Sequence, residues 1–287
     1  MILCAGELLA DITASGGEMR RRAAGAPFNV ACDIVALGGE AAFYGCAGRD
    51  GMGDWLAAEA EKCGAALMLR RSARSTPLAF VELLPGGERR FSFRAERGAD
   101  CELEISDIAD VLGQAEIFHF GSLMLRSAKG RRFAAAAAAA AHKAGAAVSF
   151  DVNLRHGLYP SVSAAVGATR EAVALADIIK LSEEEAALLT GEADAEAAVK
   201  LLSEGKTAFV TLGEKGAYAA RGGECVFMPA RPAEAVDTTG AGDAFFAAAL
   251  LELSRNGDMK AALSAGTEAG ALAVTLNASN FAGMKFY

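Results

Sequence analysis

The chain has 287 residues and a formal net charge of −8, from 28 lysine and arginine residues against 36 aspartate and glutamate residues. This length suits one large α/β domain or at most two domains, and a composition of 53% hydrophobic and 22% charged residues excludes disordered and fibrous classes. Nucleic acids and anionic membranes are bound through lysine and arginine, so the acidic balance disfavours both as partners. We therefore expect a small-molecule ligand, no nucleic acid and no membrane.

The cysteines and histidines predict neither a disulfide framework nor a zinc site. The six cysteines include no Cys-x-x-Cys pair, and only three histidines are present. The apolar N-terminal segment 1–12 carries Glu7 and Asp11 and is too short for a signal peptide. We expect buried thiols in a reducing compartment, and hence a cytoplasmic location.

Short apolar runs alternate with longer helical patterns, which is typical of repeated βα units around a mostly parallel sheet. A first strand is expected over Ile2–Leu9, and a helix from Pro27 to Leu37 that ends at Gly38-Gly39. Asp54 is expected to cap a helix that runs to Cys63. Further strands are predicted at Ala41–Cys46, Glu116–Phe120, Ala146–Val152, Asp177–Leu181 and Thr207–Leu212, with an alanine-rich helix at Ala134–Ala141.

A hairpin interrupts this alternation and is expected to project from the main sheet. Leu78–Leu84 and Arg89–Arg94 are predicted strands, joined by the Pro-Gly-Gly-Glu turn at 85–88. So few strands cannot bury both of their faces. A homodimer formed through this lid is therefore expected, with apolar surface from Phe80, Leu83, Phe91 and Phe93.

The most informative segment is Asp237-Thr238-Thr239-Gly240-Ala241-Gly242-Asp243, which precedes a helical run to Leu253. Small residues at 240–242 would leave the first N–H groups of that helix uncovered, and these groups form an anion cradle. A carboxylate beside the cradle would repel a phosphate, but Asp243 could accept the proton of a hydroxyl that attacks the phosphate. Taken alone, Asp243 could equally complement the helix dipole, with the glycines serving a tight turn.

This segment resembles the C-terminal signature of the ribokinase-like carbohydrate kinases, the PfkB family. The stretch Ala24-Gly25-Ala26-Pro27-Phe28-Asn29-Val30-Ala31, followed by Leu37-Gly38-Gly39 and Gly48-Arg49-Asp50-Gly51-Met52-Gly53, is similar to the N-terminal signature of the fructokinase branch. The resemblance covers essentially the whole chain. It implies a single domain over 1–287, with a three-layer α/β/α core, a mostly parallel sheet and a small β-sheet lid from about 12–25 and 70–98.

The resemblance also assigns roles to residues. The implied catalytic residues are the base Asp243 and the cradle of Gly240, Ala241 and Gly242. The implied substrate contacts are Asp11, Gly25, Asn29, Arg94, Asp151, Asn153 and Arg155. The implied ATP contacts are Lys180, Ser182, Glu185, Thr211, Gly213 and Gly216. Glu185 would organise Mg²⁺ through water, and Asp237 with Thr239 would help to ligate potassium. From the residues alone, Asp151 and Arg155 could equally form a structural ion pair.

The resemblance implies an ATP- and Mg²⁺-dependent kinase for a primary hydroxyl of a free sugar, with fructose favoured. The chain has no Gly-x-x-x-x-Gly-Lys-Ser/Thr loop, so the helix N-terminus would have to hold ATP. Alternative substrates are 2-keto-3-deoxygluconate, another ketose or a riboside. Arg20–Arg22 and the lid arginines would suit the carboxylate of the first of these. A non-catalytic sugar-binding relative is disfavoured by the intact cradle, and an oxidoreductase by the absence of Gly-x-Gly-x-x-Gly.

Overall fold

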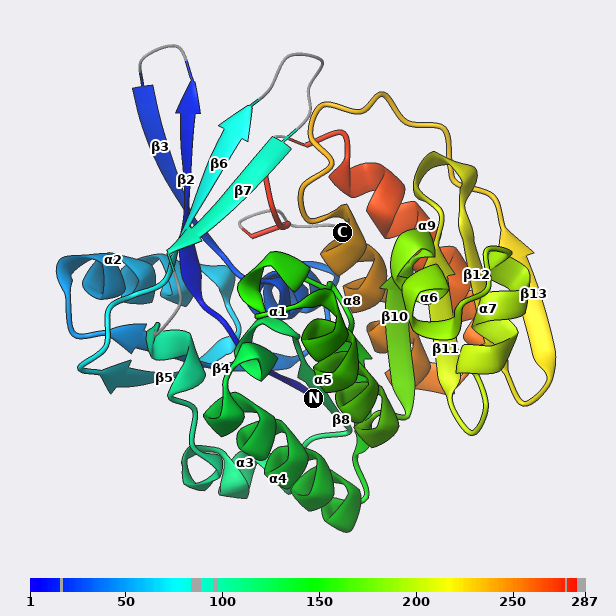
Figure 1. Ribbon diagram of the computed structural model, residues 1–287, viewed down its shortest axis with the longest axis horizontal. Helices are drawn as coiled ribbons and strands as arrows, with labels where there is room; N and C mark the ends of the chain where they lie inside the picture. The colour runs from blue at the N-terminus through cyan, green and yellow to red at the C-terminus, as the bar shows by residue number, and fades with distance from the viewer. Residues whose placement is uncertain (16–17, 84–88, 95–97, 277, 283–287) are drawn as a thin grey trace.

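The computed structural model describes residues 1–15, 18–83, 89–94, 98–276 and 278–282 (Figure 1). The strands of the main sheet are β1 (Ile2–Ala5), β4 (Ala41–Gly48), β5 (Ala66–Ser72), β8 (Ile117–Phe120), β9 (Ala147–Asp151), β10 (Ile178–Ser182), β11 (Thr207–Thr211), β12 (Ala217–Arg221) and β13 (Glu224–Met228). Their order is β13-β12-β11-β10-β9-β8-β1-β4-β5. Pairing is parallel from β11 to β5, while β12 is antiparallel to both of its neighbours.

Helices cover both faces of this sheet. One face carries α1 (Ala26–Ala36), α2 (Gly51–Ala60), α8 (Ala241–Asn256) and α9 (Met259–Ala273). The other carries α3 (Ala109–Leu112), α4 (Ala128–Ala144), α5 (Val162–Leu175), α6 (Glu183–Thr190) and α7 (Ala195–Leu202). Along β1, Ile2 and Cys4 join the first core, whereas Leu3 and Ala5 join the second. Successive strand residues point to opposite faces, so the central strands are buried on both sides and the three-layer α/β/α architecture is confirmed.

A second, four-stranded sheet rises beside the core in the order β3-β2-β6-β7 (Figure 1). Its strands are β2 (Leu9–Ser15), β3 (Glu18–Ala24), β6 (Leu78–Leu83) and β7 (Arg89–Arg94). The predicted hairpin is present as β6 and β7, and β2 also pairs with β6 in parallel. The expected lid segment 70–98 starts too early, because Ala66–Ser72 pairs with β4 in the main sheet. The predicted turn at 85–88 and Leu84 lie outside the described residues.

Two local predictions were wrong. The first strand ends at Ala5 and not at Leu9, because Gly6 adopts φ 155° and redirects the chain so that Leu9 starts the small sheet. The cap of α2 is Asp50, whose Oδ1 accepts from the N–H of Gly53 at 2.8 Å. Asp54 lies inside the first turn, and α2 ends at Ala60 before a short 3₁₀ turn.

Candidate functional site

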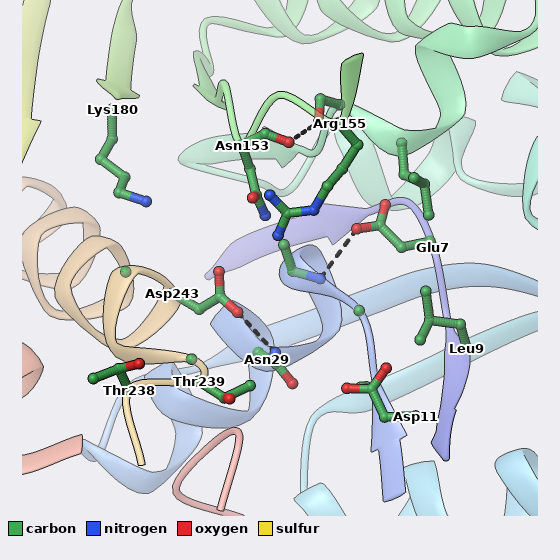
Figure 2. Close-up of a pocket in the computed structure, with 17 residues that line it drawn as sticks. Glu7, Leu9, Asp11, Asn29, Asn153, Arg155, Lys180, Thr238, Thr239 and Asp243 are labelled. Carbon is green, nitrogen blue, oxygen red and sulfur yellow. Dashed lines mark hydrogen bonds between the residues drawn. The ribbon is translucent and has the colours of Figure 1, made fainter. Parts of the chain in front are cut away.

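A cavity of about 460 Å³ opens where carboxyl ends of main-sheet strands meet the base of the small sheet (Figure 2). This edge of an open α/β sheet is where ligands are usually bound. The predicted site residues that line it are Asp11, Gly25, Asn29, Asn153, Arg155, Lys180, Thr239, Gly240, Gly242 and Asp243. The cavity is also lined by residues that were not predicted as ligands, which are Glu7, Leu9, Ala24, Ala26, Ser122, Leu123 and Thr238.

The anion cradle lies at the first turn of α8. Gly240 is the N-cap with φ 80°, a left-handed conformation that glycine adopts without a steric penalty. The expected set of three amides needs correction, because the N–H of Ala241 donates to the carbonyl of Thr238 at 3.3 Å. The methyl group of Ala241 packs in the apolar cluster around Phe281. The amides of Gly242 and Asp243, two residues that line the cavity, remain as donors of this turn without a partner inside the helix.

Asp243 stands at the wall of the cavity beside this cradle. Its side chain is largely buried, and its Oδ2 accepts from Nδ2 of Asn29 at 2.7 Å. Burial raises the pKa of Asp243, while Lys180, Asn29 and Arg155 act in the opposite direction. The close-up shows these groups converging on one space from different elements (Figure 2). A carboxylate in this position can accept a proton from a hydroxyl bound in the cavity.

Lys180 supplies positive charge next to the cradle. Its Nζ lies 3.0 and 3.2 Å from the two carboxylate oxygens of Asp151, and both residues are buried. Burial opposes its charge, but the carboxylates of Asp151, Asp243 and Glu185 hold the pKa of Lys180 above its usual value. A Cβ added to Gly242 would lie 2.7 Å from this Nζ, so the ammonium group is in contact with the cradle.

Asp151 does not lie where a substrate contact, its predicted role, would require. The side chain is fully buried beneath Lys180 and does not belong to the described lining of the cavity. An ion pair is present, as the residue pattern allowed, but its partner is Lys180 and not Arg155. Beyond β9, Asn153 has φ 31°, a costly value for a residue with a side chain, and its carbonyl accepts from Oγ of Ser122 at 2.8 Å. This turn brings Asn153 and Arg155 to the cavity.

Glu185 is held by backbone groups at the start of α6. Its Oε2 accepts from the N–H of Ser182 at 2.9 Å, and the N–H of Glu185 donates in return to Oγ of Ser182. The other carboxylate oxygen, Oε1, accepts from the N–H of Leu154. The described residues hold no group of three His, Cys, Asp or Glu side chains that could bind a metal by themselves. A Mg²⁺ ion would therefore need phosphate and water ligands, and a fixed carboxylate such as Glu185 fits contact through water.

The remaining predicted nucleotide residues follow β11. Oγ1 of Thr211 donates to the carbonyl of Leu181 at 3.3 Å, and Gly213 opens a short 3₁₀ turn with φ 59°. Gly216 has φ 126°, and a Cβ there would lie 2.1 Å from the carbonyl oxygen of Met228. The close approach of β13 to this turn is therefore sufficient to explain why position 216 is a glycine.

The predicted cation ligands lie next to the cradle and beside a lid arginine. Oδ1 of Asp237 accepts from the N–H of Thr239 at 2.8 Å. Nη1 of Arg22, from β3, lies 3.9 Å from Oδ2 of Asp237. The carboxylate fits a cation, but Arg22 already offsets part of its charge. Arg94 is exposed on β7 and is not among the described residues that line the cavity, contrary to its predicted substrate contact.

Glu7 is the lining residue that the sequence analysis most clearly missed. Its Oε1 accepts from the N–H of Ala26 at 3.1 Å, and its buried Oε2 has no hydrogen-bond partner among the described residues. Burial raises the pKa of Glu7 to about 7. A glutamate directly after a buried strand at the ligand-binding edge was the available signal.

The comparisons with known proteins agree with this geometry. A model of the pfkB family carbohydrate kinases matches residues 2–282. A probable fructokinase-5 from Arabidopsis thaliana is 36% identical over 96% of this chain and 91% of its own length. The crystal structure of a fructokinase from Xylella fastidiosa with bound ATP superposes with a TM-score of 0.89 at 31% identity, covering 99% of this chain and 94% of that one.

A third relative was solved with bound ligands. It is a double mutant of the fructokinase from Vibrio cholerae O395 with fructose, ADP and a potassium ion. It superposes with a TM-score of 0.88 at 30% identity, covering 99% of this chain and 95% of that one.

Proposed function

This chain belongs to the pfkB family of carbohydrate kinases, and we propose that it transfers a phosphoryl group from ATP to a primary hydroxyl of free fructose. The family expected from the two signatures is thereby confirmed, and with it the class of ATP-dependent carbohydrate kinase. The observation that carries the proposal is the buried carboxylate of Asp243, hydrogen-bonded to Asn29, beside the cradle of α8. We further propose that 1–287 forms one kinase domain with the small sheet as its lid.

The residues divide the reaction between binding and proton transfer. Asp11 and Asn29 would hold sugar hydroxyls so that the reacting oxygen faces Asp243, which takes its proton as the P–O bond forms. The amides of Gly242 and Asp243 and the ammonium of Lys180 would stabilise the charge on the transferred group. Glu185 would hold Mg²⁺ through water, and the ion would supply further neutralisation of that charge. The lid would exclude water, since Leu9, Asp11 and Ala24 at its base line the cavity.

The charges at the cavity favour a neutral sugar over an acid. The carboxyl groups of Glu7, Asp11 and Asp243 line it, Glu7 with a pKa raised to about 7 by burial, and the cationic side chains of Arg155 and Lys180 face them. The ammonium of Lys180 already pairs with Asp151. Of the arginines expected to receive an acid, Arg21 stacks over Trp55, Arg22 lies beside Asp237 and Arg94 is exposed, and none of these three is among the described residues that line the cavity. A carboxylate substrate would therefore meet more negative than positive groups.

The test is an assay of ADP release that gives kcat/KM for fructose, 2-keto-3-deoxygluconate and a riboside. Fructose should give the highest value. Sites built around polar partners discriminate strongly against a substrate of the wrong charge, so we expect a difference of at least about a hundredfold. A preference for the acid would refute fructose as the substrate and would leave the kinase chemistry in place.

We also propose that the protein forms a homodimer through the lid. Two large apolar side chains of this sheet, Met19 and Phe80, are exposed in the single chain. Their exposure supports a second copy of the chain covering this face of the lid. The side chains of Leu83, Phe91 and Phe93 lie outside the described residues. Light scattering at micromolar concentration should give twice the mass of 29.4 kDa, and Phe80→Ser should shift it towards the monomer. A monomer mass for the unaltered protein would refute the dimer.

A further inference from the structure

The segment 278–282 lies between the helices that carry the two central site residues. The N–H of Phe281 donates to Oδ1 of Asp33 on α1 at 2.6 Å, one helical turn beyond Asn29. The ring of Phe281 is fully buried in a cluster with Ala244 of α8. The segment thus contacts both the helix of Asn29 and the helix of Asp243.

One side chain of this segment, Asn280, continues into the site through a chain of hydrogen bonds. Its Nδ2 donates to Oδ1 of Asn29 at 2.9 Å. Nδ2 of Asn29 in turn donates to Oδ2 of Asp243 at 2.7 Å. At the other end, Oδ1 of Asn280 accepts from the N–H of Ala282 at 3.0 Å. Three side chains and one backbone group are connected in a single line.

The backbone group determines the direction of this line. An N–H can only donate, so the N–H of Ala282 turns the oxygen of the Asn280 amide towards itself and the NH₂ group away. That NH₂ group then turns the oxygen of Asn29 towards Asn280. The NH₂ of Asn29 consequently faces Asp243, whose carboxylate needs a donor. A reversed Asn29 amide would place two acceptors in contact.

We propose that Asn280 is a positioning residue for phosphoryl transfer, which holds the Asn29 amide with its N–H groups towards Asp243. The inference rests on the proposed function of Asp243 as the base. Asn280 does not line the main cavity and acts only through Asn29. The hydrogen bond from Asn29 stabilises the ionised form of Asp243, which is the form that accepts a proton.

None of the hydrogen bonds that Asn280 makes within the described part of the chain involves the other charged groups near Asp243. Those that act on it or respond to it come from several elements: Glu7 after β1, Asp11 of β2, Asp33 of α1, Asp151 of β9, Arg155 after β9 and Lys180 of β10. A change at Asn280 that leaves these groups in place isolates the contribution of the Asn29 amide. It should move the acid limb of the kcat profile to higher pH.

Two variants distinguish the loss of the hydrogen bond from Asn280 to Asn29 from the effect of an added charge at position 280. Asn280→Ala removes the donor to Asn29 without adding charge. Asn280→Asp keeps an acceptor for the N–H of Ala282, removes the donor and reverses the preferred direction of the Asn29 amide. Phe281→Leu is the matched control in the same segment, since it loosens packing and retains all three hydrogen bonds.

The experiment measures kcat from pH 5 to 9 with saturating ATP and sugar, and titrates Asp243 by NMR of ¹³C-labelled aspartate, assigned with Asp243→Asn. We expect kcat of both Asn280 variants to fall at least about tenfold at pH 6 and to recover at pH 9. Phe281→Leu should lower the melting temperature and keep the unaltered profile.

The outcomes are distinguishable. A shift in Asn280→Asp alone would be a charge effect and would overturn the proposal, as would an unchanged titration of Asp243 in both variants. If the titration moves while the kcat profile does not, Asp243 is not the base. The proposed role of Asp243 as the base would then be wrong, whereas the direction of the hydrogen-bond chain would stand.

Discussion

Gly240 and Ser279 are in backbone contact, although 39 positions apart: a Cβ built on Gly240 would lie 2.0 Å from the carbonyl oxygen of Ser279. Gly240 also has φ 80° at the N-cap of α8. The start of the cradle helix is thus fitted against the segment that carries Asn280. Gly242, two residues on, has a different neighbour, the flexible end of Lys180. The two glycines should respond differently to the same substitution.

Gly240→Ala should destabilise the protein, because it adds a left-handed strain of about 1 kcal/mol and an overlap with a backbone oxygen that costs about as much again or more. Gly242→Ala should leave the melting temperature near that of the unaltered protein, because alanine suits a helix and only the ammonium of Lys180 must move. Its kcat should nevertheless fall. Calorimetry and turnover on both variants check this, and equal melting temperatures would contradict it.

Asp243→Asn should reduce kcat by at least about a hundredfold, because the amide cannot accept the hydroxyl proton. ATP affinity should change little, since the cradle amides and Lys180 remain. Turnover and a calorimetric titration with ATP measure the two quantities separately. The control is Asp33→Asn, a buried carboxyl on α1 whose retained oxygen can still accept from Phe281. Near-normal turnover in Asp243→Asn would show that another group takes the proton.

Glu7 should make stability depend on pH. Its pKa is raised to about 7 by burial from an ordinary value of 4.5, so between these pH values the folded protein binds more protons than the unfolded chain. The free energy of unfolding should therefore fall as pH rises from 4.5 to 7, by about 3 kcal/mol for this group. Denaturation of Glu7→Gln should show a free energy of unfolding that depends less on pH. The control Glu61→Gln, at an exposed position, should show the same pH dependence as the unaltered protein. Parallel curves for all three proteins would refute this assignment.

Potassium should raise turnover relative to sodium at constant ionic strength, if Asp237 and Thr239 ligate it. The guanidinium of Arg22 lies 3.9 Å from Asp237 and competes for that carboxylate. Arg22→Ala should therefore enlarge the ratio of the rates in potassium and sodium, whereas Arg20→Ala should leave it unchanged. Identical rates in the two salts for the unaltered protein and for Arg22→Ala would count against a cation site.

The two signatures predicted the residues whose roles depend on short motifs. Asn29 and Asp243 meet at one cavity because the βα pattern places these helix N-termini at the same sheet edge, while Asp11 reaches it from β2 of the small sheet. Predictions failed where a residue's role depends on a partner far along the chain. For Asp151 an ion pair with Arg155, four positions along the chain, was one of two alternatives, whereas its partner Lys180 comes from the neighbouring strand β10.

Backbone conformation explains the other differences. The cap of α2 was expected at Asp54, but the backbone is extended at Asp50, whose side chain accepts from the N–H of Gly53 and caps the helix. Asn280 carried no recognisable signal, because its contact with Asn29 spans 251 positions and depends on a fold that brings both residues together. Gly216 matched a nucleotide motif, yet its φ and its approach to Met228 already require glycine.

The contacts of Asn29 also bear on the order of events as the chain is made and folds. Its amide meets Asp243 across 214 positions and Asn280 across 251. Contacts of such separation carry the largest loop-closure cost and form late. A nascent chain can pair β1 with β4 and pack α1 long before residue 280 leaves the ribosome. Catalytic competence should thus be acquired after the sheet, and a weakened variant should lose turnover before it loses secondary structure.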